Sequence, residues 1–185
     1  MSFESAIITV LINEIGPQFD PLHPACIHGH ILSDGDRRAT GYVNDPTDLG
    51  GETKFGIAKS SHPDLNIRNL KLSTAKSIYF NEYWKRSNCD NIVKLDDGLA
   101  TLFFDSCVNH GIPRAVKFLQ QSCGAIVDGV IGPNTMQKLA KSDLKNVYNK
   151  FIELRRQFFL DIVKNRPEQN RFLKGWLKRV DSFVR

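Results

Sequence analysis

Residues 41–57 have the sequence GYVNDPTDLGGETKFGI, and this stretch determines the expected fold more than any other. Turn-forming residues are dense in it, because the Asn-Asp-Pro of residues 44–46 is followed closely by the Gly-Gly of residues 50–51. They predict turns or a short hairpin. On both sides, apolar residues recur at spacings of three and four, as is typical of helices. The sequence therefore predicts a mainly α fold with a small turn-rich or β-hairpin element after the first helix.

A helix is predicted at the start of the chain, where Ser2 or Ser5 could cap it and Gly16 would end it. Its apolar face carries residues at helical spacing, namely Phe3, Ile7, and Val10 or Leu11. Glu14 falls on the same face in the last turn. Burial and the negative end of the helix dipole both favour the protonated carboxyl group there, and a general acid requires that form. From helix position alone, a Glu paired with a Lys or Arg is the favoured alternative.

Residues 17–40 differ in composition, with three Pro in the first eight positions and little periodicity afterwards. They predict a long loop, and such a loop inside a compact domain is usually functional or inserted. It contains His23, Cys26, His28 and His30. Their spacing matches no zinc-ligand pattern, so a solvated loop without a metal ion is predicted. Buried free thiols are predicted for the cysteines, which form no CxxC pair.

The rest of the chain predicts further helices, over residues 73–84, 96–110, 113–122 and 145–164, with others starting at Pro133 and Pro167. Residues 164–185 contain seven positive and two negative side chains, and therefore carry the whole net charge of +5. Their apolar residues form one helical stripe. The segment is predicted either to dock on the core or to bind lipopolysaccharide phosphates or anionic lipid through its cations, namely Lys174, Lys178, Arg179 and Arg185.

Residues 41–57 resemble the signature of glycoside hydrolase family 108, the phage and prophage endolysins with N-acetylmuramidase (lysozyme) activity. In that family a helix ending in Glu-Gly-Gly-Tyr runs directly into a Val-Asn-Asp-Pro segment. Here residues 14–16 (Glu-Ile-Gly) are similar to the first part and Gly41-Tyr42 onward to the second, so residues 17–40 are an insert. Later motifs follow in the family's order: Ile78-Tyr79, Tyr83-Trp84, Phe104-Asp105, Val108-Asn109-His110-Gly111, Leu119-Gln120, Asp128-Gly129, Ile131-Gly132-Pro133, Thr135 and residues 172–177.

The resemblance implies a lysozyme-like helical fold in two regions. Residues 1–112 would form the catalytic region, with residues 17–40 as its inserted loop. Residues 113–185 would form a helical peptidoglycan-binding region that ends in the basic amphipathic helix, and the two regions would pack as one compact unit. The implied activity is hydrolysis of the β-1,4 bond between N-acetylmuramic acid and N-acetylglucosamine, of the EC 3.2.1.17 type, with no cofactor and no metal ion.

The resemblance assigns Glu14 as the general acid that protonates the glycosidic oxygen. A second group must hold water or stabilise charge, and Asp48, with Thr53 in the place of the threonine of phage-type lysozymes, is the first candidate. Asp45 is the alternative second carboxylate, although both Asp residues could simply form turns. Substrate contacts are predicted for three aromatic and three amide side chains, namely Tyr42, Tyr83, Trp84, Asn44, Asn109 and Gln120. Core packing is the alternative for the aromatic residues.

Other classes of function are weaker. A peptidoglycan-binding module without catalysis would keep the aromatic residues and leave Glu14 structural. Nucleic-acid binding rests on the basic tail alone, without a recognised motif. The first apolar run, residues 6–12, lacks a preceding basic region and is a poor signal peptide. A monomer is expected, which stays in the host cytoplasm until a holin admits it to the cell wall.

Overall fold

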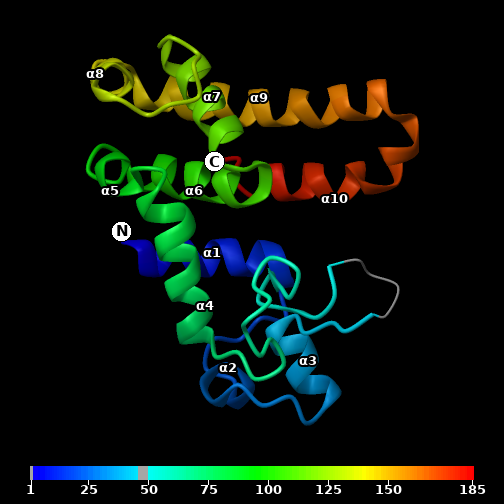
Figure 1. The fold of residues 1–185 in the computed structure, drawn as a ribbon. Helices are drawn as coiled ribbons and strands as arrows, with labels where there is room; N and C mark the ends of the chain where they lie inside the picture. The colour runs from blue at the N-terminus through cyan, green and yellow to red at the C-terminus, as the bar shows by residue number, and fades with distance from the viewer. Residues whose placement is uncertain (1, 46–49) are drawn as a thin grey trace. The chain divides into compact units, whose positions relative to one another are not determined.

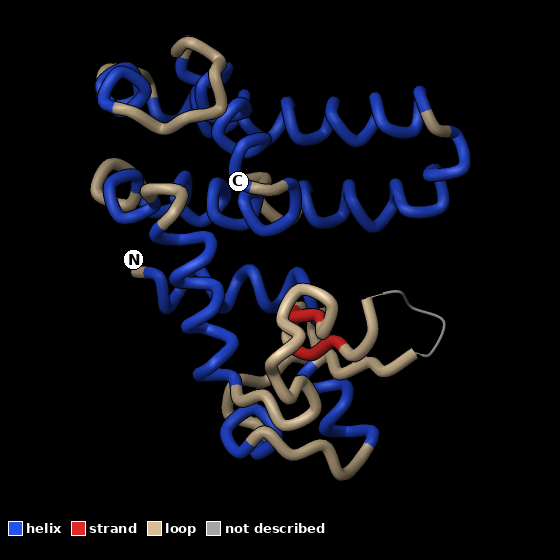
Figure 2. Tube along the Cα trace, in the orientation of Figure 1, coloured by secondary structure: helices blue, strands red, loops and turns tan. Residues whose placement is uncertain are grey.

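The computed structural model describes residues 2–45 and 50–185, and these form two compact units, Met1–Trp84 and Lys85–Arg185. The first unit consists of α1 (Phe3–Ile15), α2 (Pro24–His28), α3 (Asp34–Thr40), β1 (Thr53–Lys54), β2 (Ile57–Ala58), α4 (Leu72–Tyr79) and the start of a π-helix, η1 (Phe80–Lys85). Figure 1 shows this order by colour, and Figure 2 shows how much of the unit is loop.

Helix α1 forms the core of the first unit. It begins after Ser2 and ends at Gly16, whose φ of 104° few other residues adopt. The predicted apolar face is confirmed, because Ile7, Val10 and Leu11 are buried. The Phe3 ring lies edge-on against Phe80 and Trp84, with centroid separations of 5.0 and 5.6 Å. These contacts hold α1 against the end of α4 and the π-helix.

The turn-rich stretch forms the predicted hairpin in its described part. Strands β1 and β2 pair antiparallel, with Thr53 opposite Ala58 and Lys54 opposite Ile57. Val43 extends the pairing by an isolated bridge to Thr53. Two consecutive turn residues have positive φ, namely Phe55 (54°) and Gly56 (76°). The fold class is therefore confirmed as mainly α and lysozyme-like, with a small hairpin after the first helix.

The prediction that residues 17–40 form a solvated loop is wrong, because the segment folds into α2 and α3 with buried apolar residues. Pro24 occupies the first turn of α2, and Ser33 caps α3 with a reciprocal bond to Asp36. The Cys26 side chain is buried and free, and burial raises its pKa to about 11. Apolar periodicity did not predict these helices, because each is shorter than two turns.

The second unit is helical in its described residues. It consists of α5 (Cys89–Ile92), α6 (Asp97–His110), α7 (Ile112–Cys123), α8 (Pro133–Ala140), α9 (Leu144–Asn165), the 3-10 turn η2 (Pro167–Gln169) and α10 (Asn170–Asp181). Helix α7 packs on both α6 and α9, and α10 returns alongside α9 through η2 (Figure 1). The two compact units meet after residue 84, whereas the predicted functional boundary lies after residue 112. That boundary stays a prediction.

No helix in the described part of the chain combines the length and apolar character that a bilayer crossing needs.

A buried ion cluster joins three helices of the second unit. The fully buried carboxylate of Asp105, on α6, accepts bonds from Arg155 Nη2 at 2.7 Å and from Arg179 Nη2 at 2.8 Å. Arg155 lies on α9 and Arg179 on α10. Burial raises the pKa of the Asp105 carboxyl, but the two guanidinium groups outweigh burial and hold that pKa below its ordinary value. The sequence analysis missed the cluster, although an Asp within an otherwise buried stretch of α6 was a usable signal.

We expect Asp105→Asn to lower the free energy of unfolding by about 3–5 kcal/mol at pH 7, because it leaves two buried guanidinium groups without their counter-charge. A carboxyl whose pKa is depressed by folding stabilises above the ordinary Asp value of about 4 and loses this contribution as the pH falls. The difference between the variant and the wild type should therefore shrink below about pH 4. Urea unfolding at pH 7 and pH 3 measures both values, and equal stabilities at pH 7 would contradict the account.

Candidate active site

Glu14 lies in the last turn of α1, two residues before the glycine that ends the helix. The prediction that its side chain is buried is wrong, because Glu14 is exposed while its neighbours Leu11 and Ile15 are buried. The buried stripe therefore continues from Leu11 to Ile15, and Glu14 lies beside it on the exposed side of the last turn. An exposed carboxylate at the end of a buried helix is accessible to a polymeric substrate.

Gly56, in the hairpin turn, is the point towards which Glu14 reaches. A Cβ atom at Gly56 would lie 3.5 Å from both Cγ and Oε2 of Glu14 and only 2.5 Å from the Tyr79 hydroxyl oxygen. Tyr79 is buried, and its hydroxyl donates a hydrogen bond of 2.9 Å to the Phe55 carbonyl. The missing side chain thus brings the carboxylate, the hydroxyl and the turn backbone together.

Tyr79 was not among the predicted site residues. The motif Ile78-Tyr79 marked it as a helix residue of the family, but helical spacing predicts only that its ring is buried. Its hydroxyl is positioned by a hairpin carbonyl 24 residues earlier in the chain, which no local pattern indicates. The neighbouring Tyr83 ring lies 5.8 Å from the Tyr79 ring and is half-buried, so part of it remains accessible.

The insert returns the chain to the end of α1. Gly41 follows α3 in a left-handed conformation (φ 63°), and a Cβ atom on it would lie 3.0 Å from Ile15 Cγ1. The two parts of the motif, residues 14–16 and residues 41–42, are therefore neighbours in space although 24 residues separate them in the sequence. The chain therefore leaves the end of α1 and returns to the same place after residues 17–40.

The insert also supports the hairpin. Lys54 of β1 is fully buried, and its ammonium group donates to the carbonyls of Gly29 at 2.7 Å and Arg68 at 3.0 Å. Burial lowers the pKa of Lys54 to about 8. The Phe55 N–H donates to the Thr40 carbonyl at 2.9 Å. The turn that carries Gly56 is thus attached to the middle of the insert at Gly29 and to its end at Thr40.

The candidates for the second catalytic group lie on the hairpin and on the segment before it. Thr53 is half-buried in β1, where its backbone N–H and carbonyl pair with Val43 at 2.9 Å. Asn44 and Asp45 are exposed. Asp48 lies outside the described residues. The roles of these four residues stay predictions.

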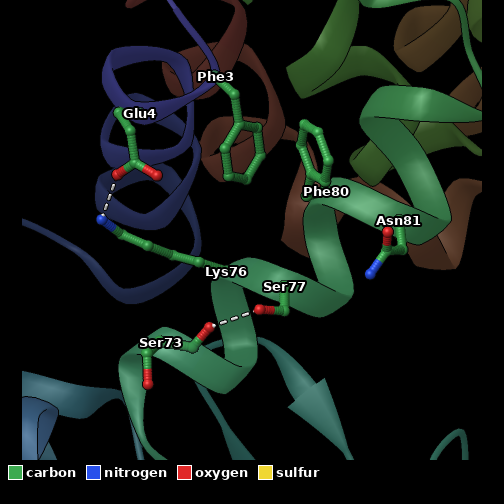
Figure 3. A pocket seen from close by; sticks show the side chains of 7 residues that line it. All are labelled: Phe3, Glu4, Ser73, Lys76, Ser77, Phe80 and Asn81. Carbon is green, nitrogen blue, oxygen red and sulfur yellow. Dashed lines mark hydrogen bonds and ion pairs between the residues drawn. The ribbon is translucent and has the colours of Figure 1, made fainter.

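The other glutamates near the start of the site make structural contacts. Glu4 forms an ion pair of 2.6 Å with Lys76, and Glu52 accepts a hydrogen bond of 2.8 Å from the Tyr42 hydroxyl. The Glu4–Lys76 pair borders a cavity of about 360 Å³ beside the facing rings of Phe3 and Phe80 (Figure 3). This cavity opens at the first turn of α1, whereas Glu14 lies in the last, so the two are separate features.

Two predicted sugar-stacking residues belong to the core. The Tyr42 side chain is 3% exposed and packs with Ala25 and Ile31 of the insert. Trp84 is 1% exposed and packs against Phe3. The stacking prediction is wrong for both, because neither ring has a face open to a sugar, and the alternative of core packing holds.

Gln120 is likewise a structural residue, so its predicted substrate contact is wrong. Its fully buried amide donates to Asp128 Oδ1 at 2.6 Å and to Thr135 Oγ1 at 3.2 Å, and accepts from the Gly129 N–H at 2.9 Å. These bonds hold the turn before α8, and they join the motif residues Gln120, Asp128, Gly129 and Thr135 in one network. Asn109 is exposed, and its role stays a prediction.

The predicted membrane-binding cations divide into two pairs. The prediction is wrong for Arg179, whose guanidinium binds the buried Asp105 and is 11% exposed. Arg185 also has an intramolecular position, with its guanidinium carbon 4.2 Å above the centre of the Tyr148 ring. Lys174 and Lys178 are exposed on α10. Their membrane role stays a prediction.

Within residues 2–45 and 50–185, the structure contains no cluster of three or more His, Cys, Asp or Glu side chains that could hold a metal ion. Cys26 is buried and its thiol faces the Ala39 carbonyl at 3.7 Å, while His28 and His30 are exposed. His23 instead caps α2 by accepting from the Ala25 N–H at 3.2 Å. The four residues considered as zinc ligands therefore do not form one cluster.

Two family models and one solved structure are similar to parts of this chain. The glycosyl hydrolase 108 model matches residues 37–111, and a predicted peptidoglycan domain matches residues 114–181. Among solved structures, SagA from Brucella abortus is similar, with 29% sequence identity and a TM-score of 0.63 over 77% of this chain and 82% of that chain. A search of curated proteins returned no match.

The first matched segment begins at the end of the insert and contains the hairpin, Tyr79 and Tyr83, which belong to the candidate site with Glu14. Glu14 reaches this segment from α1, across the junction of Ile15 and Gly41. The chain thus contains a segment that matches the glycosyl hydrolase 108 family, followed by a segment that matches a peptidoglycan domain, and these matches support a glycoside hydrolase that acts on peptidoglycan.

Proposed function

We propose that the chain is an N-acetylmuramidase that cleaves the β-1,4 bond between N-acetylmuramic acid and N-acetylglucosamine, with Glu14 as its general acid. The observation that carries this proposal is the approach of the exposed Glu14 carboxylate to the backbone of Gly56 beside the Tyr79 hydroxyl. A glycosidase needs a carboxyl group that reaches the substrate and is fixed relative to the sugar-binding surface.

The reaction requires two events. The acid donates its proton to the bridging oxygen as the bond to the leaving sugar breaks, and a second group directs water to the cationic sugar or stabilises its charge. Glu14 supplies the first event in this proposal. Asp48, Asp45 and Thr53 are the candidates for the second, because all belong to the segment that leads into the hairpin beside Glu14.

Sugar binding is assigned to the accessible side chains among those predicted. Tyr83 keeps part of its ring exposed next to Tyr79, and Asn44 is exposed before the hairpin. An aromatic face and an amide are suited to the sugar ring and to its N-acetyl group, respectively. We further propose that the enzyme serves host lysis as a phage or prophage endolysin, held in the cytoplasm until a holin gives it access to the wall.

We expect Glu14→Gln to fold normally and to release new reducing ends from purified sacculi at least about 100-fold more slowly, because loss of a general acid costs on the order of 10²–10⁴ in rate. Glu4→Gln is the matched control, since Glu4 lies on the same helix and its ion pair with Lys76 is at the surface. Full activity of Glu14→Gln would remove Glu14 from the mechanism. Binding of the wild type to sacculi without new reducing ends would support a non-catalytic module instead.

We expect Gly56→Ala to lower activity by about tenfold to 100-fold, because the new methyl group collides with the Tyr79 hydroxyl and displaces it or the turn. Gly51→Ala is the matched control for backbone strain, since Gly51 also has positive φ (69°) but its Cβ would meet its nearest neighbour, Lys59 Cβ, at 3.6 Å. Both variants should lose about 1 kcal/mol of stability. Equal activities of the two variants, measured below their melting temperatures, would show that the approach at Gly56 does not matter for catalysis.

A further inference from the structure

A cavity of about 350 Å³ lies within the second unit, and its lining includes none of the candidate site residues described above. Its lining comes from the first turns of α9, from the residue that caps α6, and from the last residue of the sequence; the side chains are Asp96, Leu144, Lys145, Tyr148, Asn149 and Arg185. Figure 1 marks the C-terminal end of the chain beside α6. Neither the mechanism nor the fold of the hairpin uses this cavity.

The guanidinium of Arg185 is held in place on two sides. Its carbon lies 4.2 Å above the centre of the Tyr148 ring, and the Tyr148 hydroxyl in turn donates 2.8 Å to the Phe183 carbonyl. On the other side, a Cβ atom at Gly98 of α6 would overlap Arg185 Nη2, so the missing side chain makes room for the guanidinium. A stacked guanidinium carries its N–H donors around its edge, and those that do not pack against Gly98 can donate to a carboxylate oxygen.

The remaining polar side chains define what the cavity suits. Lys145 adds a second cation and Asn149 an amide that both donates and accepts. Asp96 is the anion, and its Oδ1 accepts from the Leu99 N–H at 2.6 Å, which fixes its orientation. Two cations, one anion and an amide around one cavity are complementary to a ligand that carries free carboxylates and an amine.

We propose that this cavity binds the stem peptide of peptidoglycan, so that the second unit recognises the peptide part of the polymer while the first unit acts on its glycan. Stem peptides carry free carboxylates together with an amino group on a short chain. Glycan strands without stem peptides keep the lactyl carboxylate of N-acetylmuramic acid but have no amino group. The proposal rests on peptidoglycan as the partner of the proposed function, but not on cleavage by Glu14.

The test uses the full chain carrying Glu14→Gln and two soluble probes: a disaccharide that carries its stem peptide, and the same disaccharide after removal of the peptide. Isothermal titration calorimetry gives Kd for each. We expect the peptide-bearing probe to bind at least tenfold more tightly. Arg185→Ala and Asn149→Ala should each weaken the binding of that probe at least fivefold and leave the peptide-free probe unchanged.

Arg171→Ala is the matched control, since Arg171 stacks on Phe172 at 4.6 Å but does not line the cavity. Circular dichroism verifies that each variant is folded. Equal affinity for the two probes, or wild-type affinity in both cavity variants, would overturn the proposal. Release of reducing ends by the chain with native Glu14 is measured separately, so that failure of the peptide site and failure of the proposed hydrolysis give different results.

Discussion

The site depends on one close approach, in which the absence of a side chain at Gly56 lets the Glu14 carboxylate and the Tyr79 hydroxyl meet the hairpin turn. Two other contacts of the first unit support this approach. The Phe3 contacts hold α1 against the helix that carries Tyr79, and Lys54 attaches the hairpin to the insert. Glycine at this turn therefore allows both the positive φ of the backbone and the close approach of the candidate site residues.

Residues 17–40 separate α1 from the hairpin in the sequence without separating them in space. The ends of this insert meet at Gly41 and Ile15, so the chain leaves and returns at one point, and α1 keeps its place beside the hairpin. The insert packs its apolar residues Ala25 and Ile31 against Tyr42, and its Gly29 carbonyl accepts a hydrogen bond from the buried Lys54 ammonium. The cost of loop closure grows slowly with length, which makes such an excursion tolerable where its ends are adjacent.

The sequence predicted the helices well where apolar spacing extended over several turns, as in α1, α6 and α9, and where glycine or proline marked an end. It failed where tertiary contacts decide. Tyr42, Trp84 and Gln120 have the chemistry of sugar-binding residues, but their surroundings bury them. The bonds of Asp105 to Arg155 and Arg179 join residues 50 and 74 positions apart, which no local pattern reveals. The Glu14 assignment came from a family motif, whereas its exposure and its approach to Gly56 required coordinates.

The chemical identity of the new chain ends tests the central claim most directly. Purified sacculi are digested with the enzyme, the products are reduced with borohydride, and mass spectrometry identifies the reduced sugar at each end. The account predicts N-acetylmuramic acid at the new reducing ends, because the proposed bond joins its anomeric carbon to the next sugar. New ends that carry N-acetylglucosamine, or soluble products without any new reducing end, would contradict it.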